Sequence, residues 1–425
     1  MSNLGDILRQ VVCMPSDIPD DWSFLKLTDV CTPKQWRTIA SDEMTSSGYP
    51  VFGANGFVGF YHDYNHEEET VAITCRGNTC GTINRIPPKT YITGNSMALD
   101  NVRRSVITQD YLYYALTYRG VGDSVSGSAQ PQITGAGLKN IEFPAPNLPE
   151  QQKIAAILST VDDVIEKTRA QIDKLKDLKA GMMQELLTKG IGHTEFKDSP
   201  VGRIPVGWDI KILPEISRFQ NGKAFPSSDY LASDSSGVYL VKPVNLDPDG
   251  KVNWSYRSTA KLSLDYWGTA SAYRVGAGEI LMNLTAQSLE DDFLGRVCMT
   301  DLNAMCMLNQ RIARITANED IISQRYLFWA LRGRFFRQHV ERITQGSKVQ
   351  HLYNSNLELA QIAYPTSKSE QCKISFILDG IESTIAKNRY KLKANEKLKK
   401  ALMQDLLTGK VRVRIDNKVE GRVAV

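Results

Sequence analysis

The feature that most constrains this chain is a repeated segment of 39 residues. Residues 150–188 read EQQKIAAILSTVDDVIEKTRAQIDKLKDLKAGMMQELLT, and residues 370–408 read EQCKISFILDGIESTIAKNRYKLKANEKLKKALMQDLLT. Aligned without a gap, 16 of the 39 positions are identical, whereas chance would give about two or three. The chain is therefore organised as two copies of one unit.

Both copies of the repeat predict a long helix. Apolar residues recur every three to four positions, which is the spacing of a heptad-like seam. A helix of this length measures roughly 58 Å and cannot bury its apolar stripe alone, so the other copy is the expected partner. The predicted seam consists of Ile154, Leu158, Val161, Ile165, Ile172 and Leu175 in the first copy and Ile374, Leu378, Ile381, Ile385 and Leu392 in the second.

Three polar residues interrupt this seam: Thr168, Asn388 and Asn395. A buried polar residue at a seam position costs stability but penalises wrong registers. Alternatively, these three positions face solvent where the helices pack loosely. The sequence leaves both interpretations open.

The segments that precede the two helices also match each other, although faintly. Trp22 pairs with Trp208, YLYYAL at 111–116 with YLFWAL at 326–331, and GSAQPQI at 127–133 with GSKVQHL at 346–352. Short runs of β-forming residues between Gly, Asn and Pro turns predict several short strands followed by one helix in each segment. The predicted order is globule, helix, globule, helix.

Composition excludes several classes of protein. With 42% hydrophobic and 23% charged residues in 425, the chain is globular rather than disordered. It has no run of 18 apolar residues, so no membrane span is expected, and its first residues lack a secretory signal. Seven cysteines at irregular spacing indicate a reducing compartment. These observations together predict a cytoplasmic protein, and a net charge of +4 does not by itself indicate a nucleic-acid binder.

Enzymatic motifs are absent from the sequence. We find no phosphate-binding loop, dinucleotide-binding glycine motif, nucleophile elbow or His-Glu-x-x-His motif. Cys75 and Cys80 lack the second pair in register that a zinc site needs. His62 and His66 could bind a metal, but a solvated polar loop is the favoured interpretation. Glu195 and Lys197 form only the short E-x-K pattern of some nucleases, within a linker.

The two copies keep their scaffold residues and differ in their polar loops. This is the pattern of two binding domains that read different targets on one scaffold. Ordinary drift of loop sequences would leave the same pattern. Loops of this kind lie around 32–37, 74–80 and 128–132 in the first copy and around 221–223, 283–292 and 345–351 in the second.

The chain resembles the specificity subunit of a type I restriction–modification system. The resemblance rests on LPEQQKIAAIL followed by MQELLTKG, repeated as SEQCKISFIL and MQDLLTGK. It extends to TPKQWRTI, GYPVFGANG and ITCRGNTCGTIN in the first globule, and to FQNGKAF, ILMNLTAQSLEDDFLGRVC and LNQRIARI in the second. The linker FKDSPVGRIPVGWDIKIL is similar as well. The match covers almost the whole chain, in order, twice.

The resemblance implies a mixed α+β fold with a pseudo-twofold internal repeat. Two globular α/β target recognition domains would be separated by two long helices that form an antiparallel coiled coil. The expected divisions are an N-terminal arm, recognition domain 1, spacer helix 1, a linker, recognition domain 2, spacer helix 2 and a C-terminal tail. Their bounds are 1–19, 20–149, 150–189, 190–205, 206–368, 369–410 and 411–425.

The resemblance also implies a function without catalysis. Each recognition domain would read one half of a bipartite, asymmetric sequence in double-stranded DNA, and the helices would set the spacing and dock the partners. Those partners would be two methyltransferase subunits and two restriction or motor subunits, and S-adenosylmethionine, ATP and Mg would bind to them rather than to this chain. Two alternatives remain: a methylation-only system, and a coiled-coil scaffold that binds proteins.

Candidate DNA contacts follow from side-chain chemistry in the divergent loops. Gln and Asn can bridge adenine edges and Arg can bridge guanine, whereas Lys and Arg can also contact phosphate alone. We predict contacts from Lys34, Gln35, Arg37, Arg76, Asn78, Gln130 and Gln132 in the first domain and from Lys223, Asn283, Gln287, Lys348, Gln350 and His351 in the second.

Overall fold

A computed structural model describes most of the chain. The described residues are 18–54, 56–127, 130–231, 235–254, 259–286, 293–301, 305–344 and 350–415. The chain divides into two compact units. The first unit consists of Met1–Ala170 and Arg389–Val425, and the second of Gln171–Asn388. Each unit therefore combines one globular part with about half of each long helix.

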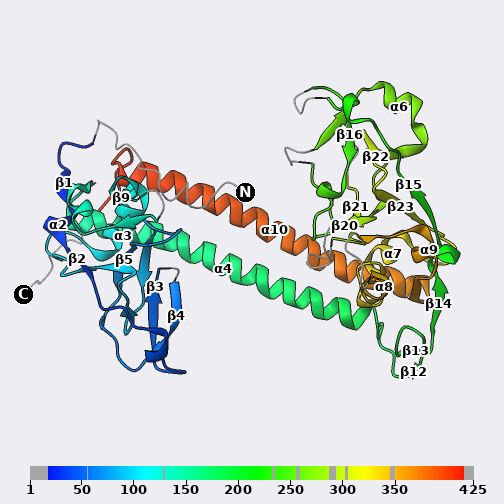
Figure 1. The fold of residues 1–425 in the computed structure, drawn as a ribbon, viewed down its shortest axis with the longest axis horizontal. Coiled ribbons are helices and arrows are strands. Elements are labelled where there is room, and N and C mark those ends of the chain that lie inside the picture. The colour runs from blue at the N-terminus through cyan, green and yellow to red at the C-terminus, as the bar shows by residue number, and fades with distance from the viewer. Residues whose placement is uncertain are drawn as a thin grey trace, which may run out of the picture. The chain divides into compact units, whose positions relative to one another are not determined.

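The two repeated segments form the long helices α4 (Leu148–Leu186) and α10 (Lys368–Leu407) (Figure 1). Most predicted seam positions are buried, and four are half-buried: Val161, Leu175, Ile381 and Leu392. Of the polar interruptions, Thr168 is buried and its hydroxyl donates to the Val164 carbonyl at 2.6 Å. Asn388 and Asn395 are half-buried. The burial favours a seam position for Thr168.

The first globular part contains two α-helices and eleven strands among its described residues, besides three 3-10 turns. The helices are α2 (Leu27–Val30) and α3 (Gln109–Arg119). The strands are β1 (Ser23–Lys26), β2 (Thr32–Gln35), β3 (Tyr49–Gly53), β4 (Gly56–Tyr61), β5 (Thr70–Thr74), β6 (Ile83–Ile86), β7 (Tyr91–Ile92), β8 (Ser96–Asp100), β9 (Val125–Ser126), β10 (Gln132–Ile133) and β11 (Glu142–Ala145).

The second globular part repeats this order with additions. Its helices are α5 (Leu213–Ile216), α6 (Asp265–Thr269), α7 (Gln324–Ala330), α8 (Arg334–Thr344) and α9 (Asn354–Glu358). Its strands are β12 (Phe196–Lys197), β13 (Ile204–Pro205), β14 (Trp208–Ile212), β15 (Ser217–Asn221), β16 (Val238–Val241), β17 (Ala260–Leu262), β18 (Arg274–Val275), β19 (Ile280–Asn283), β20 (Thr285–Ala286), β21 (Val297–Met299), β22 (Cys306–Leu308), β23 (Ile312–Ala317), β24 (Gln350–His351) and β25 (Gln361–Pro365).

The sheets of the two units share one topology. The antiparallel sheet β2-β8-β5-β6 in the first unit corresponds to the antiparallel sheet β15-β23-β19-β21 in the second. A second sheet, β4-β3-β7, corresponds to β17-β16-β22 of the four-stranded sheet β17-β16-β22-β18, and the pairs β3-β7 and β16-β22 are both parallel. The two-stranded pair β1-β11 likewise corresponds to β14-β25. The faint sequence match between the globules therefore reflects the same order of strands.

The helix that follows the sheets is capped in the same way in each unit. The hydroxyls of Thr108 and Ser323 accept from the backbone N–H groups of Tyr111 and Tyr326, both at 3.2 Å, as N-cap residues do. In the second unit α7 is followed by a further helix, α8, although the sequence predicted only one helix here. The predicted linker 190–205 also contains structure, because β12 pairs with β13.

Each hydrophobic core joins a globular part to the long helices. In the first unit Trp22 and Tyr111 belong to a buried cluster that includes Ile154 from the start of α4 and Leu406 from the end of α10. In the second unit the corresponding cluster contains Trp208, Tyr326 and Trp329, and the long helices contribute Leu186 and Ile374 to it. The apolar stripe of each helix therefore continues into a globular core. Among the described residues, no helix is long and apolar enough to cross a membrane.

Candidate nucleic-acid interface

Three segments of the first unit meet at one corner, and each carries a predicted contact residue. At the end of β2, the side-chain amide of Gln35 donates to Cys75 Sγ and to the Gly94 carbonyl, both at 3.0 Å. The next residue after Cys75, Arg76, forms an isolated backbone bridge with Gln132 in β10. Gln35, Arg76 and Gln132 are all exposed. The fold thus gathers residues that are almost a hundred positions apart in sequence.

The internal bonds of Gln35 limit what it can offer to DNA. Both hydrogens of its amide point at protein acceptors, so its carbonyl oxygen is the group that remains for a base. Burial raises the pKa of the Cys75 thiol, and the hydrogen bond from Gln35 opposes this rise. The thiol therefore stays protonated and acts as a fixed, neutral neighbour of the corner.

The remaining predicted residues of the first unit lie within two positions of the three corner residues in the sequence. Lys34 is exposed, and its ammonium lies 3.5 Å from the ring centroid of Trp36. Arg37 is exposed and forms an ion pair with Glu43, so a DNA phosphate would have to compete with that carboxylate. Asn78 is exposed in a turn, and Gln130 is exposed in a bend.

The second unit has the same corner with different side chains. In the first unit the backbone N–H of Ile133 donates to the Cys75 carbonyl at 3.0 Å, and in the second the N–H of Leu352 donates to the Leu284 carbonyl at 2.9 Å. In both units the neighbouring residues pair as well: Arg76 with Gln132, and Thr285 with His351. Thr285 and His351 therefore occupy the positions of Arg76 and Gln132.

Two predicted residues of the second unit lie at this corner. His351 is exposed. Lys223 is exposed, and its backbone bonds to Leu308 and Gln310 beside the corner, at 3.0 Å each. Its ammonium lies 5.9 Å from the ring centroid of Phe225, two residues further on. The strand registers match Lys223 with Arg37 of the first unit.

The prediction for Asn283 is wrong. Its side chain is fully buried, and its amide donates to the carbonyls of Thr285 and Phe293, both at 2.8 Å. Asn283 thus holds together the two ends of the segment that joins β20 to β21, and it cannot reach a base. Gln287 and Lys348 lie outside the described residues. For Gln350 the structure gives only the backbone, which pairs with Ala286 in β20.

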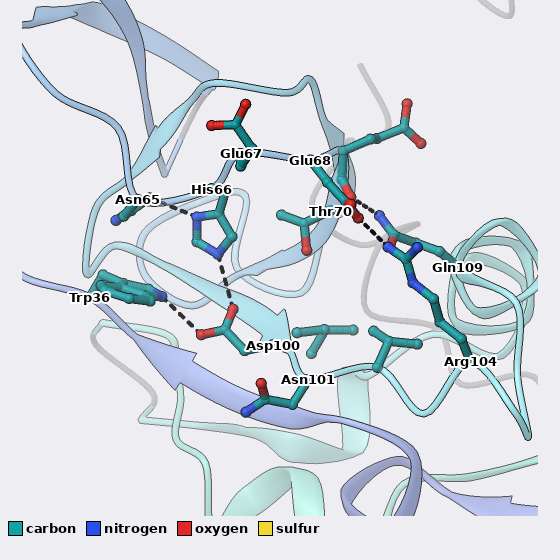
Figure 2. Close-up of a pocket in the computed structure, with 13 residues that line it drawn as sticks. Trp36, Asn65, His66, Glu67, Glu68, Thr70, Asp100, Asn101, Arg104 and Gln109 are labelled. Carbon is teal, nitrogen blue, oxygen red and sulfur yellow. Dashed lines mark hydrogen bonds and ion pairs between the residues drawn. The ribbon is translucent and has the colours of Figure 1, made fainter.

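Sequence reasoning missed Trp36, which stands between two predicted contact residues. Trp36 lines a cavity of about 390 Å³ together with His66, Asp100 and Arg104 (Figure 2). The figure shows the His66 ring between Asn65 and Asp100, and Trp36 Nε1 donates to the same Asp100 carboxylate. The sequence does contain a signal for Trp36, because it is an aromatic residue inside the basic and polar segment Lys34–Arg37. Among the described residues, no group of three or more His, Cys, Asp or Glu side chains could hold a metal ion.

Comparison with known proteins identifies the family. The family model of the type I restriction modification DNA specificity domain matches twice, at residues 19–177 and 205–396. The chain belongs to this family. The two matches coincide with the two globular parts and most of the helix that follows each of them.

Curated relatives and solved structures agree with this family. The specificity subunit of the type I restriction enzyme MjaVIII from Methanocaldococcus jannaschii is 27% identical over 411 residues, which is 93% of this chain and 94% of the relative. A putative MjaX specificity subunit from the same organism is 25% identical over 435 residues, 94% of this chain and 95% of that protein. The crystal structure of an S subunit from M. genitalium superposes with a TM-score of 0.65 at 15% identity, covering 93% of this chain and 98% of that one. The likeness to the M. genitalium structure shows the fold alone, because the sequence identity is low.

Proposed function

We propose that this chain is the DNA sequence specificity subunit of a type I restriction–modification complex and that each globular part reads one half of a bipartite target. The proposal rests on the equivalent corners of the two units. Both units build this corner from the same backbone pairs, but the exposed side chains are Gln35, Arg76 and Gln132 in one unit and Lys223 and His351 in the other. Different donors and acceptors on one scaffold imply two different half-sites.

The long helices are proposed to form an antiparallel coiled coil that sets the gap between the half-sites. Two ion pairs between them support this direction: Asp162–Lys399 in the first unit and Lys179–Glu382 in the second. From one pair to the other the position on α4 rises by 17 residues while the position on α10 falls by 17. Such a fixed register gives a spacer whose length cannot change without disturbing every seam contact.

The chain itself is proposed to be non-catalytic. Two methyltransferase subunits would supply S-adenosylmethionine and take the target base out of the duplex, and two restriction subunits would supply ATP and Mg. The surface of α10 supports docking of such partners. Phe376 and Tyr390 are 80% and 79% exposed, although the corresponding positions on α4 are Ala156 and Ala170. Two large exposed apolar side chains, 14 residues apart on one helix, favour a protein partner.

Domain exchange followed by methylation sequencing tests this function. Residues 20–149 would be replaced by the first recognition domain of another specificity subunit, and both chains would be expressed with the methyltransferase. We expect the exchange to change one half of the methylated motif and to keep the gap and the other half. A change in both halves, or the absence of any bipartite motif with the original chain, would contradict the proposal. Restriction of unmethylated phage DNA separates a full restriction system from a methylation-only one.

A further inference from the structure

The segment Lys34–Arg37 carries three predicted DNA contacts, and its geometry depends on Trp36. The Lys34 ammonium lies 3.5 Å from the centroid of the indole ring. An ammonium over an indole face is attracted by the ring, so the position of the ring sets the position of the charge. Because β2 ends at Gln35, the strand ladder does not fix Trp36, and other contacts must hold the indole.

One hydrogen bond to the Asp100 carboxylate helps to hold the indole, and His66 contacts the same carboxylate. Trp36 Nε1 donates to Asp100 Oδ2 at 3.2 Å, and His66 Nε2 lies 2.9 Å from Asp100 Oδ1. The His66 ring also packs edge-on against the indole, with ring centroids 5.5 Å apart. Figure 2 shows both groups directed at Asp100 from different segments of the chain. Asp100 thus ties the β2 segment to the segment that precedes β5.

His66 is fixed from its other side by Asn65. His66 Nδ1 lies 2.6 Å from Asn65 Oδ1, and that oxygen also accepts from the Ile92 N–H at 2.8 Å. Asn65 Nδ2 donates to the Ile92 carbonyl at 3.0 Å, so the orientation of its amide is determined. Both ring nitrogens of His66 therefore face oxygen atoms. The His66 and Asp100 side chains are 9% and 14% exposed, which makes this a largely buried network in which each group has a partner.

Packing and the hydrogen bond to Asp100 act together on the indole. On one side Trp36 packs against the buried cluster of Ala72, Ile86, Ile92 and Ala98. Trp36 lines the cavity of about 390 Å³, so open volume lies beside it. A ring beside such a volume can turn into it once its hydrogen bond is lost. The orientation of Trp36 therefore depends on Asp100 and, through Asp100, on His66.

The second unit offers a natural comparison. The strand registers match Gln35 with Asn221, so Gln220 and Gly222 stand where Lys34 and Trp36 stand in the first unit. A glutamine and a glycine cannot form the lysine–indole contact at these two positions. The Asp100–His66 network thus belongs to the first unit alone, and breaking it would leave the reading of the second half-site intact.

We infer that Trp36, Asp100 and His66 are positioning residues for base reading by the first recognition domain. They act through the segment Lys34–Arg37, whose side chains face the DNA under the proposed function, and the inference rests on that function. Without the network, the segment adopts several positions and no longer discriminates among bases at its part of the half-site.

Four variants test this role in the full chain, purified with its methyltransferase. Trp36→Phe keeps a ring but removes the N–H, and Asp100→Ala removes the carboxylate. Asp100→Asn is the rescue variant, because its oxygen can accept from Trp36 while its amide donates to an unprotonated His66 Nε2. Asp123→Ala is the matched control: it removes the ion pair with Arg119 (2.7 Å) in the same unit but touches none of residues 34–37.

The readout is the ratio of methylation rates on the correct target and on targets with a single substitution in either half. For Trp36→Phe and Asp100→Ala we expect this ratio to fall about tenfold at one or two positions of the first half, the size expected for one lost base contact. The second half should not change, and Asp100→Asn and Asp123→Ala should behave as the original chain. Unchanged discrimination, or an equal loss in both halves, overturns the inference. If the original chain itself shows no bipartite motif, the proposed function fails instead.

Discussion

Gln151 at the start of α4 and Gln371 at the start of α10 make the same three hydrogen bonds in their own units. The Oε1 atom of Gln151 accepts from the Thr108 N–H at 2.9 Å, and its Nε2 donates to the carbonyls of Val106 and Pro146 at 3.0 and 2.8 Å. The Oε1 atom of Gln371 accepts from the Ser323 N–H at 2.7 Å, and its Nε2 donates to the carbonyls of Ile321 and Pro365 at 3.0 and 2.9 Å. Both side chains are buried. Each glutamine joins its long helix to the short helix of the adjacent globular part.

Replacing either glutamine should weaken one unit only. Gln151→Leu or Gln371→Leu fills a similar volume but leaves one N–H and two carbonyls without partners. We expect a loss of roughly 2–4 kcal/mol in the free energy of unfolding, measured by urea denaturation. Gln152→Leu is the control, because Gln152 is exposed on the next position of α4. If Gln371→Leu were as stable as this control, the bonds would not contribute to stability.

The sequence predicted the long helices well because their signal is local and periodic. The predicted helices 150–189 and 369–410 differ from α4 and α10 by two or three residues at most ends. Gln35, Arg76 and Gln132 were each predicted from a polar stretch that differs between the copies, and the structure brings the three together, with Gln35 at the end of β2 and Gln132 in β10. Sequence patterns of this kind locate a surface without giving its geometry.

What the sequence did not reveal depends on contacts between distant segments. Asp100 bonds to Trp36, 64 positions away, and to His66, 34 positions away, and no periodicity relates these residues. Asn283 was wrongly assigned to the interface because a polar residue at a strand end looks the same whether it faces solvent or closes a loop. Only the buried carbonyls of Thr285 and Phe293 distinguish the two cases.

A charge in the helix seam should destabilise the fold. Ile385 is 1% exposed, so Ile385→Asp buries a carboxylate without a partner. We expect a cost of about 3–5 kcal/mol and loss of the complex with the methyltransferase, and Ile165→Asp should behave alike. Ser383→Asp is the control, at an exposed position of the same helix. Equal melting temperatures and equal assembly of the two α10 variants would contradict the seam assignment of Ile385.

The pair Lys179–Glu382 should matter more when one partner is removed than when both are. The two side chains are 15% and 11% exposed, and burial lowers the pKa of Lys179 while its hydrogen bond to Glu382 opposes this shift. Glu382→Leu leaves a buried ammonium, and we expect a loss of roughly 3 kcal/mol, at the low end for a buried pair because some exposure remains. Lys179→Met combined with Glu382→Leu should leave the free energy of unfolding almost unchanged.

The pH dependence of that pair has a definite sign. The folded chain holds Lys179 with a pKa below its ordinary value, so unfolding takes up a proton between the lowered value and the ordinary value. Stability should therefore rise with pH across that window. Lys179→Met should remove the rise, as followed by urea denaturation at several alkaline pH values. The same slope in the variant would show that other groups cause it.

The two halves of the target should respond separately to the two equivalent corner residues, Gln132 and His351. Gln132 is exposed, and its backbone is fixed by the bridge to Arg76, so truncating its side chain should leave the fold intact. A glutamine that bridges an adenine edge contributes about 1–3 kcal/mol of discrimination against the wrong base. Gln132→Ala should therefore relax one base of the first half-site and leave the second unchanged.

His351→Ala should relax one base of the second half-site and leave the first half-site unchanged. His351 occupies the same position in the second unit and is paired with Thr285. The measurement is the methylated motif and the methylation rate on each single-substitution target, with each variant serving as the control for the other. If Gln132→Ala weakened methylation equally on every target sequence, Gln132 would contact phosphate or support the fold instead. If both variants relaxed the same half, the assignment of one half-site to each unit would be wrong.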